Sequence, residues 1–97
     1  MEKKKKKYYN EITNINGPGN VMADGCNSIT FYSPPDNTGT LRVNSLPVKS
    51  GCMFGLDGLE GEQDTTVYDV KIDNIGASDA YYVIRKFYRD DNNSTNN

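Results

Sequence analysis

The sequence contains no histidine and no tryptophan, and only two of its 97 residues are cysteine. Without histidine, the chain has no Ser-His-Asp or Cys-His catalytic pair and no imidazole acid, base or zinc ligand. Cys26 and Cys52 are too far apart for a CxxC metal or redox site. The glycines lack the GxxxxGK[ST] or GxGxxG spacing that cradles phosphate. These absences predict that the protein is not an enzyme and uses no cofactor.

Long apolar runs are also missing. No segment approaches the ~20 apolar residues that span a bilayer, and the basic start is followed by the polar residues 8–14 rather than by the apolar stretch of a signal peptide. We therefore expect a protein made in the cytoplasm, without a membrane partner. There Cys26 and Cys52 are expected to be small buried hydrophobic residues. The alternative is a disulfide, whose loop closure would contribute on the order of 3 kcal/mol.

The apolar content is low. Hydrophobic residues make up 35% of the chain, against roughly 45–50% (glycine included) in ordinary globular proteins. A chain of 97 residues forms one domain, and a domain of this size buries about 60–65% of the surface that its unfolded form exposes. Seven tyrosines outnumber three phenylalanines, and tyrosine suits partly buried or interfacial positions. We expect a thin core and a homo-oligomer stabilised by association.

Charge is divided unevenly along the chain. The net charge of −2 combines +4 in residues 1–7 (five lysines, one glutamate) with −6 in the remainder (six basic, twelve acidic residues). We interpret residues 1–7 as a basic N-terminal arm, and its lysines are candidates for partner binding: Lys3, Lys4, Lys5, Lys6 and Lys7. Three roles stay open for the arm: a solvated tail, docking on the acidic face of a neighbouring protein, and contact with the phosphates of nucleic acid. Contact with nucleic acid is the least favoured of the three.

The strand pattern is clearest at residues 66–72. Tyr68, Val70 and Ile72 fall with Thr66 on one side of an extended chain, and polar residues predominate on the other. Alternation with period 2 is typical of a half-buried β-strand. Residues 41–44 and 52–56 are predicted to be two further strands, joined through residues 46–51. We expect these three strands to form one small antiparallel unit.

Further strands are predicted at residues 8–15, 21–23, 27–32 and 80–88, separated by turns rich in Gly, Pro and Asn. We expect Ile12 to be the buried residue of the first of these strands, and Ile29 and Phe31 to lie on the inner face of the third. The predicted fold is all-β, a small antiparallel β-sandwich or flattened barrel of six to seven strands. It occupies residues 8–89 and is followed by a polar tail, residues 90–97.

The last predicted strand carries apolar residues on both faces. This pattern suits a central strand, or a strand covered by another subunit. Its aromatic residues are therefore candidates for contact with a partner, because tyrosine is favoured at interfaces, with core packing as the alternative: Tyr81, Tyr82, Phe87 and Tyr88.

One acidic loop requires separate weighing. Its carboxylates are Asp57, Glu60, Glu62 and Asp64, with glycines between them. Calcium takes several oxygen ligands from loops of this kind, although the spacing is not that of an EF-hand. A solvated turn and contact with the lysines of a neighbour are the other two interpretations, and the turn is favoured over a metal site.

A resemblance adds to this picture. In succession, residues 27–31 (NSITF), 39–48 (GTLRVNSLPV), 61–68 (GEQDTTVY) and 83–86 (VIRK) resemble small β-rich virion proteins of tailed bacteriophages, crAss-like phages above all. The resemblance implies a non-enzymatic structural protein of the capsid-decoration, auxiliary or head-fibre type. Its partners would be other virion proteins, the major capsid protein among them. It would be located in the virion, after assembly in the host cytoplasm.

Residues and resemblance together favour a capsid decoration subunit that acts by oligomeric burial against its neighbours. The alternative is a carbohydrate- or receptor-binding β-sandwich module of a fibre or cell surface. Asn, Asp and Tyr suit sugar hydroxyls, but the absence of tryptophan counts against this alternative. A third hypothesis is a DNA-associated protein that uses the lysine run.

Overall fold

The computed structural model describes residues 6–73 and 79–90. These residues contain no helix, and therefore none that could cross a membrane. They form eight strands: β1 (Lys6–Ile15), β2 (Gly19–Met22), β3 (Ser28–Tyr32), β4 (Thr40–Val43), β5 (Leu46–Val48), β6 (Met53–Asp57), β7 (Val67–Asp73) and β8 (Tyr81–Asp90). The all-β prediction is confirmed, but the described strands number eight rather than six to seven.

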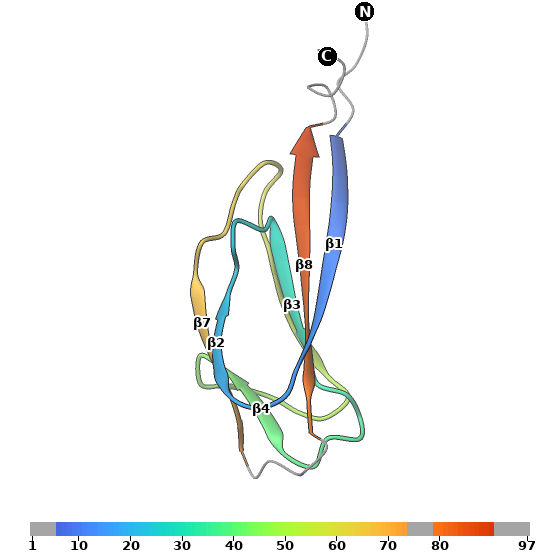
Figure 1. Cartoon of the computed structure of the whole chain (residues 1–97), viewed down its shortest axis with the longest axis vertical. Helices are drawn as coiled ribbons and strands as arrows, with labels where there is room; N and C mark the ends of the chain where they lie inside the picture. The colour runs from blue at the N-terminus through green and yellow to red at the C-terminus, as the bar shows by residue number, and fades with distance from the viewer. Residues whose placement is uncertain (1–5, 74–78, 91–97) are drawn as a thin grey trace, which may run out of the picture.

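The strands form two antiparallel sheets (Figure 1). Sheet A has the order β1-β8-β3-β6, and sheet B has the order β2-β7-β4-β5. Strands from the two halves of the chain pair in sequence from the ends inward: β1 with β8, β2 with β7, β3 with β6, and β4 with β5. The chain is thus one long hairpin wound into two sheets, which is the strand order of a jelly roll.

The core lies between the two sheets. Sheet A contributes Ile29, Phe31 and Val83, together with Tyr81, all with 0% exposure. Sheet B contributes a matching set of buried side chains: Val21, Leu41, Val43, Val48, Tyr68, Val70 and Ile72. The rings of Phe31 and Tyr68 meet edge to face across the interior, with centroids 5.3 Å apart. The inner faces therefore pack on each other in a sandwich-like arrangement.

The alternation predicted for residues 66–72 is confirmed in β7. Tyr68, Val70 and Ile72 are buried, while Val67, Asp69 and Lys71 are exposed. The expected three-stranded unit is wrong, however. β7 pairs with β4, but β6 pairs with β3 in the other sheet.

The segment expected to connect two strands is itself a strand, β5. It follows β4 through Asn44 and Ser45, whose φ angles are 48° and 74°, and Val43 pairs directly with Leu46. Positive φ at both central residues is the geometry of a tight two-residue hairpin turn. The dipeptide Asn-Ser is an unusual choice for that turn, which explains why the sequence did not indicate a hairpin here.

β1 is an edge strand, and its burial differs from the prediction. Ile12 is 65% exposed, so the prediction that it is buried is wrong. It pairs with Ile84 on the outer face of sheet A, and Ile15 instead packs against the core. A strand with only one neighbour has few side chains to cover its outer face.

β8 is central, as its apolar residues on both faces indicated, and lies between β1 and β3. β3 pairs only with the segment Tyr82–Lys86 of β8, whereas β1 pairs with β8 over all ten residues. Beyond Lys86, β1 and β8 therefore continue alone as a two-stranded ribbon that extends past the sandwich (Figure 1). β1 begins at Lys6 and β8 ends at Asp90, so pairing extends beyond residues 8–89.

Candidate interaction surface

The outer face of sheet B carries four charged side chains and, at one end, the exposed apolar pair Met22 and Val67. Arg42 pairs with Asp73, and Lys71 lies 3.7 Å from Asp69. These side chains are between 40% and 66% exposed. Exposed ion pairs of this kind contribute little to stability, and their charged groups are well solvated.

The outer face of sheet A has a different character. Its side chains are those that alternate with the buried residues of β3 and β8. The strand register places them in rows: Tyr8 opposite Tyr88, Ile12 opposite Ile84, and Tyr32 between Tyr82 and Met53. A polar row, Asn10 opposite Lys86, lies between the first two. Ile12 is 65% exposed and Met53 is 64% exposed. We call these residues the tyrosine face: Tyr8, Ile12, Tyr32, Met53, Tyr82, Ile84 and Tyr88.

Ring contacts hold the tyrosine face in place. Tyr8 and Tyr88 meet edge to face at 5.4 Å between centroids, and Tyr32 lies 6.2 Å from Tyr82. The Nζ of Lys86 lies over the Tyr8 ring, 4.7 Å from its centroid, which is a cation–π geometry. The face thus presents apolar groups with polar tips, and protein interfaces are enriched in tyrosine and methionine.

The opposite side of the β1–β8 pair is anchored to sheet B. Tyr9 stacks on Phe87 with centroids 5.2 Å apart. Arg85, whose side chain is only 12% exposed, donates from Nε to the carbonyl of Met22 in β2 at 2.9 Å and from Nη1 to Glu11 at 3.3 Å. These contacts fix the direction in which the two strands leave the sandwich.

The four predicted aromatic residues separate into two groups. Tyr82 and Tyr88 belong to the tyrosine face and are half-buried. Phe87 is half-buried on the other side of β8 and packs against the core. Tyr81 is fully buried, so its assignment to a partner surface is wrong and the alternative of core packing holds. The alternation along β8 had placed Tyr81 and Tyr82 on different faces, but without showing which face was inside.

The lysine arm is only partly within the described residues. Lys3, Lys4 and Lys5 lie outside them. Lys6 and Lys7 form the start of β1, where their backbones pair with Asp90 and Arg89. A role of the arm in binding a partner stays a prediction.

The sequence missed five members of the tyrosine face: Tyr8, Ile12, Tyr32, Met53 and Ile84. Each lies at an alternate position of its strand. What joins them is the pairing register across β1, β8, β3 and β6, and pairing between distant segments leaves no signal in a single sequence.

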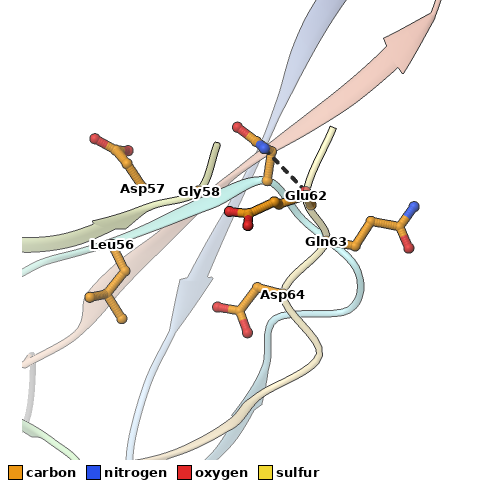
Figure 2. A pocket seen from close by; sticks show the side chains of 7 residues that line it. Leu56, Asp57, Gly58, Glu62, Gln63 and Asp64 are labelled. Carbon is orange, nitrogen blue, oxygen red and sulfur yellow. Dashed lines mark hydrogen bonds between the residues drawn. The ribbon is translucent and has the colours of Figure 1, made fainter. Parts of the chain in front are cut away.

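The acidic loop borders a pocket of about 370 Å³ at the end of β6. Asn27, which is 5% exposed, holds the loop in place: its Nδ2 donates to the carbonyls of Leu59 at 2.6 Å and Glu62 at 3.1 Å. Gly58 N donates to the Asn27 carbonyl at 2.9 Å. The pocket is lined by Asn27, Leu56, Asp57, Gly58, Glu62, Gln63 and Asp64 (Figure 2).

The carboxylates of this loop do not converge. Figure 2 shows Asp57, Glu62 and Asp64 at separate places around the pocket. Glu62 accepts a hydrogen bond from Leu59 N at 2.6 Å, and Asp64 accepts one from Thr66 N at 2.8 Å. Within residues 6–73 and 79–90, no group of three His, Cys, Asp or Glu side chains could hold a metal ion. The calcium interpretation therefore finds no support among the described residues, and Glu62 and Asp64 instead accept hydrogen bonds from the backbone of their own loop.

Tyr68 adds a second bond to Asp64. Its hydroxyl donates to Oδ2 at 2.6 Å. Burial and the nearby Asp64 raise the pKa of Tyr68 to about 12. Burial would also raise the pKa of Asp64, but the hydrogen bonds from Thr66 and Tyr68 outweigh it, and the pKa lies below its ordinary value. This pair of residues therefore favours a neutral phenol beside an ionised carboxylate.

The two cysteines are free thiols. Cys26 is buried, as expected for a small hydrophobic residue, and burial raises its pKa. Cys52 is exposed, so the same expectation is wrong for Cys52. The alternative of a disulfide between them is not realised.

Comparison with protein-family models, with curated proteins and with solved structures finds no match for this chain. Any assignment of function must therefore start from the tyrosine face, the β1–β8 ribbon and the loop pocket.

Proposed function

We propose that this protein is a non-enzymatic structural subunit that acts by burying its tyrosine face against neighbouring subunits. The observation that carries the proposal is the set of aromatic pairs on the outer face of sheet A, where Tyr8–Tyr88 and Tyr32–Tyr82 lie beside Ile12 and Met53, which are 65% and 64% exposed. The outer face of sheet B also has exposed apolar side chains, Met22 and Val67, but its described residues include no aromatic side chain and carry ion pairs such as Lys71–Asp69. Apolar groups gathered on one face mark interaction surfaces.

Burial of this face would offset the thin core. Removing apolar surface from water contributes roughly 25 cal/mol per Å². Tyr8, Tyr88, Tyr32 and Tyr82 are already held by ring contacts, so docking would order few additional side chains. Low ordering cost and apolar burial favour association of this face. A small domain with little interior gains more from neighbours than a large one does.

The proposed assembly is the virion of a tailed phage, in which the subunit decorates or reinforces the capsid beside the major capsid protein. Two observations support this choice. The chain resembles small phage virion proteins in the segments given above, and jelly-roll strand order is common among viral capsid domains. Fold alone does not determine function, so the proposal depends on the tyrosine face and the resemblance together.

The loop pocket favours a second candidate, a carbohydrate- or receptor-binding module. Its lining includes the amides of Asn27 and Gln63 and the carboxylates of Asp57 and Glu62, and such groups bind sugar hydroxyls. Jelly rolls also include lectin domains. A glycan array separates the candidates: saturable binding that is lost in Gln63→Ala supports the module, and no binding supports the structural subunit.

Mass spectrometry of purified virions tests the proposed location. A structural subunit is expected in many copies per particle, at a constant ratio to the major capsid protein. Its absence from purified particles would refute the virion assignment.

A further inference from the structure

The described sheets leave four edge strands, and only one of them is long and open. β5 has three residues and contains Pro47, β2 has four residues, and β6 has five with Gly55 at its centre. Natural proteins keep sheet edges short or interrupt them, because an open edge pairs with other chains. β1 instead has ten residues, no proline, and one-to-one pairing from Lys6↔Asp90 to Ile15↔Tyr81 without a bulge. Its two lysines, Lys6 and Lys7, occupy only the first two positions and leave residues 8–15 without an edge lysine.

We propose that the open edge of β1 binds β1 of a second copy of this chain, antiparallel and across a two-fold axis, so that the two copies of sheet A become one continuous sheet. The inference deepens the proposed function, on which it rests, by naming the partner of this edge. A two-fold axis makes the same edge serve on both subunits.

The side chains of β1 select a register centred on Asn10. In that register Asn10 lies opposite Asn10 of the second copy, and Tyr8 lies opposite the partner subunit's Ile12. Both side chains belong to the outer face, with exposures of 42% for Tyr8 and 65% for Ile12. Pairs of an aromatic and a β-branched residue directly opposite each other stabilise antiparallel sheets, and the symmetry forms this pair twice.

The same register supports the ribbon. Among the described strands, β8 is the only one that pairs with residues 6–9 of β1, and β3 does not reach past Lys86 of β8. A two-stranded ribbon is marginally stable in water. Pairing about Asn10 places residues 6–9 of each copy beside residues 11–14 of the other, which are backed by β8 and β3 of that copy. Each ribbon then extends a sheet rather than standing alone.

The charges of β1 are compatible with pairing to a second copy. Its charged residues are Lys6, Lys7 and Glu11. The register centred on Asn10 places them opposite Asn14, Thr13 and Tyr9 of the second copy, so no like charges lie opposite each other in the paired edges.

Position-specific cross-linking of the full-length chain tests the register. In a Cys52→Ser background, Asn10→Cys places two thiols opposite each other, within the Cα separation that a disulfide accepts. Asn14→Cys is the matched control. The Asn14 side chain is also exposed, but in the proposed register it lies far from Asn14 of the second copy. We expect a covalent dimer from Asn10→Cys under mild oxidation and little from Asn14→Cys. Equal cross-linking of the two variants would overturn the inference.

Analytical ultracentrifugation tests the association itself. The wild-type chain is expected to form a reversible dimer, and Ile12→Lys is expected to raise the dimer dissociation constant by about tenfold or more, because an edge lysine opposes strand pairing. Leu59→Lys makes the same kind of change at a loop side chain with 75% exposure and should leave the dimer intact. A wild-type chain that stays monomeric at every concentration, or an Ile12→Lys variant that dimerises like the wild type, would refute this edge pairing.

A failure of the β1 edge pairing can be distinguished from a failure of the proposed function. The variant Met53→Lys changes the tyrosine face at β6, the edge of sheet A opposite β1. It should leave the dimer unchanged while weakening incorporation into particles. A monomeric chain that is still abundant in virions would contradict the edge pairing alone.

Discussion

The hydroxyl of Tyr68 in β7 donates a 2.6 Å hydrogen bond to the carboxylate of Asp64, joining the core of sheet B to the loop that precedes it. Tyr68 is 4% exposed and also packs its ring against Phe31. The contact couples the ionisation of one phenol to the stability of the fold.

Alkaline pH should destabilise the protein through this phenol. The pKa of Tyr68 is raised from 10.0 to about 12 in the folded state. Its contribution is therefore fully present below pH 10 and is lost as the pH rises toward about 12, because the unfolded chain loses its proton first. The expected loss in the free energy of unfolding is on the order of 3 kcal/mol.

Urea unfolding across the alkaline range measures this loss. Tyr68→Phe should be less stable than the wild type at neutral pH by roughly 0.5–1.5 kcal/mol, since it lacks the bond to Asp64. It should also lose less stability between neutral and alkaline pH. An identical alkaline decline in the two proteins would show that Tyr68 does not titrate as its surroundings require.

The close approach of Gly58 to Asn27 predicts a glycine requirement. A Cβ at position 58 would lie 2.7 Å from the carbonyl oxygen of Asn27, whereas one at Gly19 would meet nothing within 4 Å. Gly58→Ala should therefore lower the free energy of unfolding by about 1–3 kcal/mol. Gly19→Ala, at an open position, serves as the control and should change it by less than about 1 kcal/mol. Equal unfolding midpoints for the two variants would refute the close contact.

Tyr81 predicts an unusual response to the removal of a polar group. Its side chain is fully buried, and its hydroxyl finds no hydrogen-bond partner among the residues that the structure describes. Burying such a group costs about 1–3 kcal/mol. Tyr81→Phe is therefore expected to unfold at an equal or higher urea concentration than the wild type. A clearly less stable variant would mean that the hydroxyl has a partner in solution.

Local patterns predicted much of the fold. The alternation of Tyr68, Val70 and Ile72 marked β7 and its inner face, and Ile29 and Phe31 did the same for β3. Alternation depends only on neighbouring residues, so a single sequence contains it. The turn at Asn44 and Ser45 escaped prediction because its positive φ angles come without glycine.

The pairing of strands that are distant in the chain could not be predicted from the sequence. The sequence predicts that Ile12 is the buried residue of its strand, but the edge position of β1 leaves it exposed. Tyr81 and Tyr82 are equally aromatic, and only the side on which sheet B lies decides that one is core and the other surface. The tyrosine face likewise exists only through the order β1-β8-β3-β6, which joins segments from both ends of the chain.

The most direct test of the central claim compares copy numbers in purified virions by quantitative mass spectrometry. Particles would be assembled with the wild-type chain, with Met53→Lys on the tyrosine face, or with Leu59→Lys in the loop as the control. Burial of the tyrosine face predicts a high and equal copy number for the wild type and Leu59→Lys, and a copy number reduced by about tenfold for Met53→Lys, since a buried unpaired lysine is costly. Equal incorporation of all three chains, or no wild-type chain in the particles, would contradict it.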